Sequence, residues 1–193
     1  LSAVGQAIGL RVALHESDGT APVGRGIGPA LEAADVLAVL RRAPAAPTDL
    51  RDRALDLAGR LLDMAPGASG KTGRARAEKL LDSGAADAKF MAICAAQGGF
   101  RDPGEAPQRA EMLAPAAGYI TAIDNRLIAR IAKLAGAPRQ QRAGVRLLVR
   151  VGEPVETGQP LYEIHAETTG ELAYARAYAE SHAGALSLSE DTA

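Results

Sequence analysis

The sequence predicts an α/β plus α+β protein, in which a helix-rich remnant of an α/β domain precedes a small C-terminal α+β domain. Helical hydrophobic spacing dominates residues 33–97, whereas short alternating runs typical of strands dominate residues 119–165. Between them, residues 101–109 contain two prolines, a glycine and several charges, which is the composition of a linker. We therefore expect one domain over residues 1–100, a linker over 101–109 and a second domain over 110–193.

Residues 1–8 are expected to form the end of a helix that Gly9 terminates. A buried strand is expected over the apolar run Leu10–Leu14, before a glycine-rich turn. Thr48 is placed to cap a helix N-terminus, after a proline-rich connector over residues 43–47. Apolar spacing predicts four helices in this half of the chain, over residues 33–40, 48–62, 74–81 and 86–97.

The second half predicts a helix from Asn125, a last helix over 173–182, and four strands, over residues 119–123, 145–151, 161–165 and 185–189. Its turn-rich residues 152–161 are similar to a hairpin of biotinyl and lipoyl carrier domains. Such carriers need an exposed lysine on a separate tight turn, but the only lysine after Lys89 is Lys133, inside a helical run. We therefore interpret the hairpin as architecture, in a domain with hammerhead-like strands.

Composition excludes several classes of protein. The 193 residues carry a formal net charge of −1, which gives no electrostatic reason to expect nucleic acid or an anionic membrane as a partner. The single cysteine, Cys94, rules out an intrachain disulfide framework and a multi-cysteine metal site. No apolar run approaches the length of a membrane span and no signal peptide is recognisable, so we expect a cytoplasmic protein.

The most informative segment is the glycine-rich turn over residues 18–32, because glycine-rich turns between a strand and a helix often hold ligands or ions. Its glycines do not fit the dinucleotide fingerprint, since Pro29 stands where the third glycine should be. A Walker loop is also absent: Gly70-Lys71-Thr72 lacks the first glycine, which would stand at Ala65, and no strand precedes it.

Four runs carry a resemblance to a known family: PVGRGIGPALEAADVLAVL, PTDLRDRALDLAGRLL, FMAICAAQGG and the long ending GYITAIDNRLIARIAKLAGAPRQQRAGVRLLVRVGEPVETGQPLYEIHAE. They resemble the C-terminal part of thymidine phosphorylase and its pyrimidine-nucleoside phosphorylase relatives, in the subgroup that includes the archaeal AMP phosphorylases. The resemblance extends in order from Leu1 to about Ala183, and the family's chain is more than twice as long. It implies that this chain is a C-terminal fragment.

The resemblance implies an enzyme in which inorganic phosphate attacks a pyrimidine nucleoside and releases the free base and pentose 1-phosphate. The family's phosphate-binding loop and its Arg, Ser and Lys base contacts precede Leu1, so no catalytic residue is expected in this chain and its substrate-binding residues are unknown. We expect this fragment alone to be inactive and the full-length protein to be a homodimer. Two alternatives remain open: a nucleoside-monophosphate (AMP-type) phosphorylase, and a non-catalytic structural or interaction module.

The resemblance also implies a cation site at the glycine-rich turn, for potassium or calcium. Matched position by position, its ligands are the carbonyls of Val23 and Gly26 and the carboxylate of Asp35, which stands where bacterial members carry a Glu. Hard cations take such oxygen ligands. The alternative is that Asp35 is a solvated carboxylate on a helix surface and the glycines only permit close packing.

The three histidines and the cysteine have simpler interpretations. His15 borders the presumed cleft and is a candidate for substrate contact. Alternation places Glu163, His165 and Glu167 on one face of a strand, which we expect to be the solvated one. His182 is expected to be a cation at a helix C-terminus, and Cys94 a small core residue.

Overall fold

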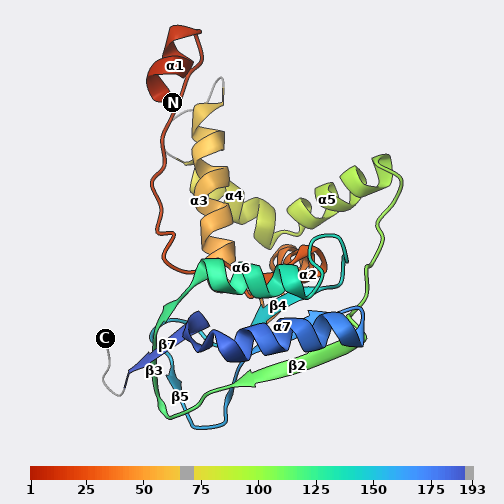
Figure 1. Ribbon diagram of the computed structural model, residues 1–193. Coiled ribbons are helices and arrows are strands. Elements are labelled where there is room, and N and C mark those ends of the chain that lie inside the picture. The colour runs from red at the N-terminus through yellow and green to blue at the C-terminus, as the bar shows by residue number, and fades with distance from the viewer. Residues whose placement is uncertain (66–71, 190–193) are drawn as a thin grey trace.

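The computed structural model describes residues 1–65 and 72–189 (Figure 1). The helices in this part of the chain are α1 (Ser2–Ala7), α2 (Pro29–Leu40), α3 (Thr48–Met64), α4 (Gly73–Asp82), α5 (Ala85–Ala96), α6 (Asn125–Leu134), α7 (Thr169–Ser181) and the short 3-10 helix η1 (Ala183–Ala185). The strands are β1 (Gly26–Ile27), β2 (Gln108–Leu113), β3 (Gly118–Ile123), β4 (Gly144–Leu147), β5 (Pro154–Val155), β6 (Pro160–Ala166) and β7 (Leu186–Ser189). A helix-rich first half and a mixed second half confirm the predicted fold class.

The first 25 residues depart from the prediction. The run Leu10–Leu14 forms no strand, and the side chains of Leu10 and Leu14 are exposed. Helix α1 and the extended segment after it run along the outside of the molecule (Figure 1). A strand requires a neighbour to satisfy its backbone groups, and no described segment lies beside this run as a strand partner. The prediction of a buried strand here is therefore wrong for this chain.

Helices α2 to α5 form the rest of the first half. A small apolar cluster joins α2, α3 and α4 around Val39, Leu55 and Leu81. Thr48 is the first residue of α3 and its hydroxyl makes no capping hydrogen bond, so the predicted cap is not formed. Helix α5 projects from the other helices (Figure 1), and none of its residues is buried. Cys94 on this helix is half-buried, not the core residue expected.

The principal sheet has the strand order β1-β4-β6-β2, with every pair antiparallel. Strand β1 is the two-residue edge at the end of the glycine-rich turn, and it pairs Gly26 with Arg146 and Ile27 with Val145 of β4. Strand β2 was not predicted, and its first residues lie inside the expected linker. The turn is thus hydrogen-bonded to a strand beyond that linker. A domain boundary at residues 101–109 stays a prediction.

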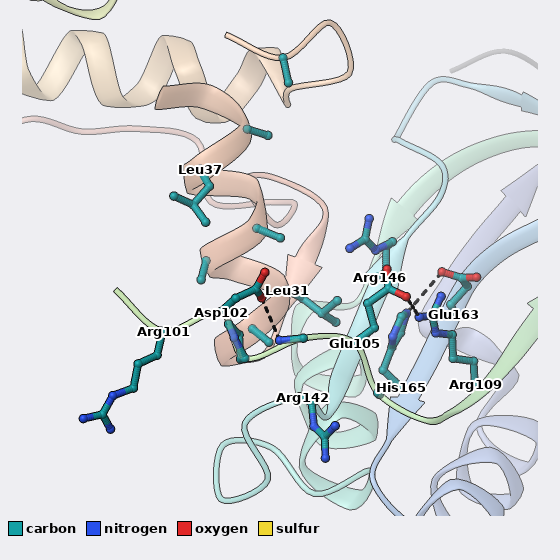
Figure 2. Close-up of a pocket in the computed structure, with 18 of the residues that line it drawn as sticks. Leu31, Leu37, Arg101, Asp102, Glu105, Arg109, Arg142, Arg146, Glu163 and His165 are labelled. Atoms are coloured by element: carbon teal, nitrogen blue, oxygen red, sulfur yellow. Dashed lines mark hydrogen bonds and ion pairs between the residues drawn. The ribbon is translucent and has the colours of Figure 1, made fainter. Parts of the chain in front are cut away.

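One face of this sheet is polar, although it is not open to solvent. In register, Arg109 of β2 stands opposite His165 of β6, and Glu163 of β6 stands opposite Arg146 of β4. Figure 2 shows these side chains gathered on the same side of the strands, near α2. His165 is only 3% exposed. The expected solvated face is therefore wrong for His165, because α2 and the segment before β2 come from distant parts of the sequence and cover it.

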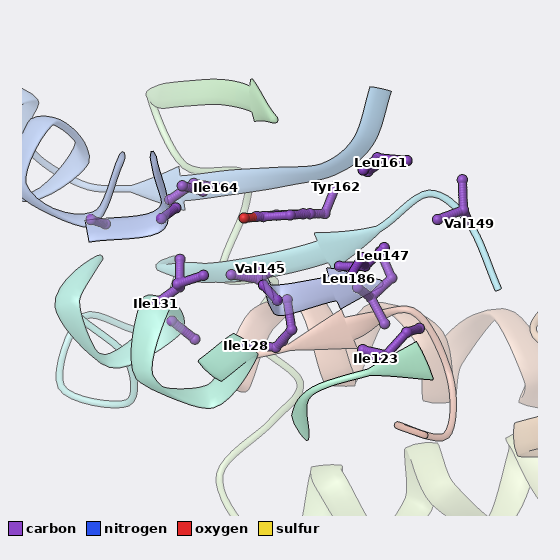
Figure 3. Close-up of a cluster of buried hydrophobic side chains, with 14 of the residues drawn as sticks. Ile123, Ile128, Ile131, Val145, Leu147, Val149, Leu161, Tyr162, Ile164 and Leu186 are labelled. Atoms are coloured by element: carbon purple, nitrogen blue, oxygen red, sulfur yellow. The ribbon is translucent and has the colours of Figure 1, made fainter. Parts of the chain in front are cut away.

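The opposite face of the sheet packs on α6 and α7 and forms the main core (Figure 3). Alternate residues of the two central strands, Val145 and Leu147 of β4 and Tyr162 and Ile164 of β6, point into it. Burial raises the pKa of Tyr162 to about 12. A second sheet, ordered β5-β3-β7, adds Ile120, Ile123, Val155 and Leu186 to the same core.

Candidate functional site

The glycine-rich turn is held by Asp35, which lies two turns into α2. The Asp35 carboxylate is 8% exposed, and its Oδ2 accepts hydrogen bonds from the amides of Arg25 at 2.6 Å and Gly26 at 2.8 Å. Interpreting Asp35 as a solvated surface carboxylate is therefore wrong. Its side chain is a structural acceptor for the turn.

Asp49, in the first turn of α3, is a second carboxylate at the same turn. Its Oδ2 accepts from the Gly24 amide at 3.3 Å and from the Arg25 guanidinium at 3.3 Å. Three successive amides, those of residues 24–26, therefore donate to two carboxylates. Glycine-rich loops that bind phosphate direct such amides at the anion instead. In this turn the amides are already used, so the groups left for a ligand are carbonyl oxygens.

Strand geometry fixes the direction of one predicted carbonyl ligand. The Arg25 carbonyl accepts from the Leu147 amide at 2.8 Å and so points toward β4, while the Arg25 amide donates to Asp35. Successive residues of a strand alternate in direction, so the amide and carbonyl of Gly26 point away from β4. The Gly26 amide on that side reaches Asp35. The Gly26 carbonyl and the Asp35 carboxylate therefore lie along one edge of the turn.

The other predicted carbonyl ligand, that of Val23, accepts no hydrogen bond from the described residues. Within residues 1–65 and 72–189 no cluster of three or more His, Cys, Asp or Glu side chains could hold a metal ion. The predicted cation ligands are one carboxylate and two backbone carbonyls. A count of ligating side chains therefore does not test them. The cation site at Val23, Gly26 and Asp35 stays a prediction.

Two positions of the turn require glycine for different structural reasons. Gly24 adopts φ +84°, a left-handed conformation that favours glycine, and a Cβ there would lie 2.8 Å from Asp35 Oδ2. Gly26 has ordinary strand geometry, but a Cβ on it would lie 2.4 Å from the Leu31 carbonyl carbon in α2. Gly24 therefore allows the turn, and Gly26 allows α2 to pack against the strand.

Arg150, which follows β4, connects this site to the second half of the chain. Its guanidinium lies 3.5 Å from Asp49 Oδ1 and 3.3 Å from the Thr48 hydroxyl. Asp49 thus stands between two arginines, Arg25 and Arg150. The sequence by itself places Asp49 only in the first turn of a helix. Its role depends on two segments more than 20 residues away in the sequence, which no local pattern could show.

The remaining candidates lie apart from the turn or outside the described residues. His15 is half-buried in an irregular segment, and a substrate contact by it stays a prediction. His182 ends α7 and stacks on Tyr178 with ring centroids 4.0 Å apart. The Gly70-Lys71 pair of the rejected Walker motif lies outside the described residues.

His165 is the buried polar group that the sequence analysis misplaced. Its Nε2 lies 3.3 Å from Glu163 Oε2. Burial lowers the pKa of His165 below its ordinary value of 6.5, while Glu163 opposes that shift. The ring is therefore neutral at pH 7, and its Nε2–H donates to the Glu163 carboxylate.

The chain resembles known proteins over nearly its whole length. Residues 119–183 match the pyrimidine nucleoside phosphorylase C-terminal domain. The chain is 53% identical over 182 residues to the putative thymidine phosphorylase 1 of Cupriavidus necator, covering 94% of this chain and 35% of that protein. It is 54% identical over 191 residues to the putative thymidine phosphorylase of Polaromonas sp., covering 99% of this chain and 37% of the relative.

These matches support the assignment of the chain to the C-terminal part of the pyrimidine nucleoside phosphorylase family. It spans about a third of the length of the curated relatives it matches, which are named putative thymidine phosphorylases. No helix in the described part of the chain is long and apolar enough to cross a membrane.

Proposed function

We propose that this chain supplies the C-terminal part of a thymidine phosphorylase-like enzyme. The observation that carries the proposal is sequence identity above 50% over almost the entire chain to proteins named putative thymidine phosphorylases. The full-length enzyme would be a homodimer, as the family resemblance implies, and we expect it in the cytoplasm.

In the proposed reaction, an oxygen of inorganic phosphate forms a bond to the anomeric carbon of a pyrimidine nucleoside. The glycosidic bond breaks, and its electron pair goes to the base nitrogen, which takes up a proton. No residue of this chain is assigned to those steps. Its contribution would be the loop over residues 18–28, which would face the cleft and whose residues 24–26 are hydrogen-bonded to Asp35 and Asp49.

A bound potassium or calcium ion is part of this proposal. The proposed ligands are oxygen atoms, a carboxylate and backbone carbonyls, which hard cations prefer. The buried Asp35 carboxylate and the Gly26 carbonyl lie along one edge of the turn. Such an ion would supply positive charge beside the phosphate site. The ligands contributed by this chain would be Val23, Gly26 and Asp35.

The first test is an ultraviolet assay of base release from thymidine, uridine and AMP in the presence of phosphate. We expect the full-length gene product to cleave thymidine and uridine, and this chain alone to release no base. Turnover of AMP in preference to the nucleosides would replace the proposal with the nucleoside-monophosphate alternative. A full-length protein inactive on all three substrates would favour the non-catalytic module.

The second test concerns the cation and uses the full-length enzyme with Asp35→Asn, Asp35→Glu and the surface control Asp56→Asn. Under the proposal, Asp35→Asn should abolish the response of activity and thermal stability to added potassium or calcium. Asp35→Glu, which restores the residue of the bacterial members, should keep that response. If all three variants respond to ions like the wild type, the turn holds no cation and Asp35 only anchors its backbone.

A further inference from the structure

A cavity of about 560 Å³ lies on the polar face of the principal sheet, apart from the glycine-rich turn. Its floor is formed by β2, β6 and β4, one wall by α2, and another by the irregular segment of residues 100–106. The volume falls in the range of small-molecule sites, which combine a mostly apolar lining with a few polar groups. Figure 2 shows the polar groups of the floor clustered beneath α2.

Most charges around this cavity are already paired. Arg109 of β2 forms an ion pair with Glu105, and Glu163 accepts from the buried ring of His165. Arg142 binds Glu167, and Figure 2 shows its guanidinium directed away from the cluster. The neutral ring of His165 does not compensate the charge of Glu163, which stands opposite Arg146 in the sheet.

Arg146 of β4 is the exception. It is half-buried, yet its guanidinium forms no hydrogen bond or ion pair with any described residue. The other unpaired arginines of the lining, Arg41 and Arg101, are exposed, where water satisfies them. Glu163 offsets the charge of Arg146 from across the sheet, but no acceptor oxygen of a described residue bonds the planar guanidinium donors, which a carboxylate or phosphate matches best.

Two backbone amides of the lining are also without an acceptor among the described residues. The amides of Glu105 and Ala106, both in the lining, have no hydrogen-bond acceptor in the described part of the chain. Ala106 is only 5% exposed. Glu105 is exposed, so its amide can bind water, whereas the Ala106 amide and the Arg146 guanidinium are donors of the lining that no described residue accepts and that fit an acceptor with several oxygens.

The opposite wall has a different chemistry. Helix α2 presents small and aliphatic side chains to the cavity, namely Ala30, Leu31, Ala34, Leu37 and Ala38. Alanines on one helix face make a flat apolar surface, against which a planar group can lie. With Arg142 paired to Glu167, four arginines of the lining remain against three carboxylates, so the cavity combines a net positive charge with one flat apolar wall.

We propose that this cavity binds a small molecule in which an oxyanion, phosphate or carboxylate, is joined to a flat apolar group. The oxyanion lies against Arg146 and the amides of Glu105 and Ala106, and the flat group lies against α2. The neutral ring of His165 closes the floor beneath it. This site is distinct from the turn at Asp35 and does not depend on the proposed phosphorylase activity.

Isothermal titration of the 193-residue chain tests the proposal with four probes: phenyl phosphate, benzoate, inorganic phosphate and the uncharged benzamide. We expect one-to-one binding of phenyl phosphate or benzoate, at least about tenfold tighter than that of inorganic phosphate or benzamide. Which aromatic anion binds more tightly distinguishes a phosphate ligand from a carboxylate ligand. Failure of both to bind at concentrations up to about 10 mM would overturn the proposal.

Two variants localise the binding. Arg146→Met removes the charge, and Ala34→Phe fills the apolar wall from an exposed helix position without changing any charge. Each should weaken binding by about tenfold or more. The matched control is Arg130→Met on α6, because Arg130 is exposed on a helix that covers the other face of the sheet. Wild-type affinity in both cavity variants, or equal weakening in the control, would contradict the site.

Discussion

Replacing Asp35 by alanine should destabilise the chain far more than removing an ordinary helix-surface carboxylate. Asp35 Oδ2 accepts from two backbone amides, at 2.6 and 2.8 Å, and the side chain is buried. Hydrogen bonds to a charged group contribute about 1.5–3 kcal/mol each, so the loss of two predicts a decrease of about 3–6 kcal/mol in the free energy of unfolding. For a chain of this size the melting temperature should fall by at least about 6 °C.

The measurement is thermal unfolding followed by circular dichroism, with Asp56→Ala as the matched control. Asp56 is a carboxylate on α3 whose only described side-chain partner is the exposed Arg74, and such surface pairs contribute about 0–1 kcal/mol. Hydrogen exchange adds a local readout, since the amides of Arg25 and Gly26 should lose protection in Asp35→Ala. Equal melting temperatures for the two variants, with those amides still protected, would refute the assignment of Asp35 as the anchor of the turn.

Three further predictions follow from the same structure. Gly26→Ala places a Cβ against the Leu31 backbone and should cost about 1–3 kcal/mol by overpacking, whereas Gly19→Ala, with open space around it, should leave the melting temperature unchanged or slightly higher. Because burial lowers the pKa of His165 in the folded state, the unfolded chain binds more protons below pH 6.5. Stability should therefore be complete above pH 6.5 and decrease as the pH falls below it, and His165→Gln should flatten this dependence in thermal melts. Limited proteolysis should cut first within residues 99–112 or 66–73, and early cuts inside residues 145–165 would argue against a boundary at 99–112.

Much of the helical structure could be predicted from the sequence because a helix is specified by its own side chains. The spacing of Ile128 and Ile131 places one apolar face on α6, and Asp124 before it caps the helix by accepting from the amides of residues 126 and 127. The strands β3, β4 and β6 were found for a similar reason, since their alternation or apolar runs are visible locally. The family resemblance was also contained in the sequence.

The errors concern elements whose state depends on a distant partner. Strand β2, with the sequence QRAEML, has too many polar residues to be recognised alone, and it forms because its backbone pairs with β6. The run Leu10–Leu14 has the composition of a buried strand, but the described chain offers it no neighbour. Strand formation requires hydrogen bonds between segments, so composition by itself could not decide either case.

The sequence by itself determined the class of fold and most helix positions. Only the tertiary structure decided what its polar residues do. Asp35 became a buried anchor because α2 folds back over its own turn, and Asp49 because Arg25 and Arg150 converge on it. His165 lies on a face that alternation predicted to be solvated, but α2 and residues 100–106 cover it and enclose the cavity beside Arg146. Periodicity tells which side of an element a residue faces, whereas burial and charge pairing depend on which distant segments cover that side.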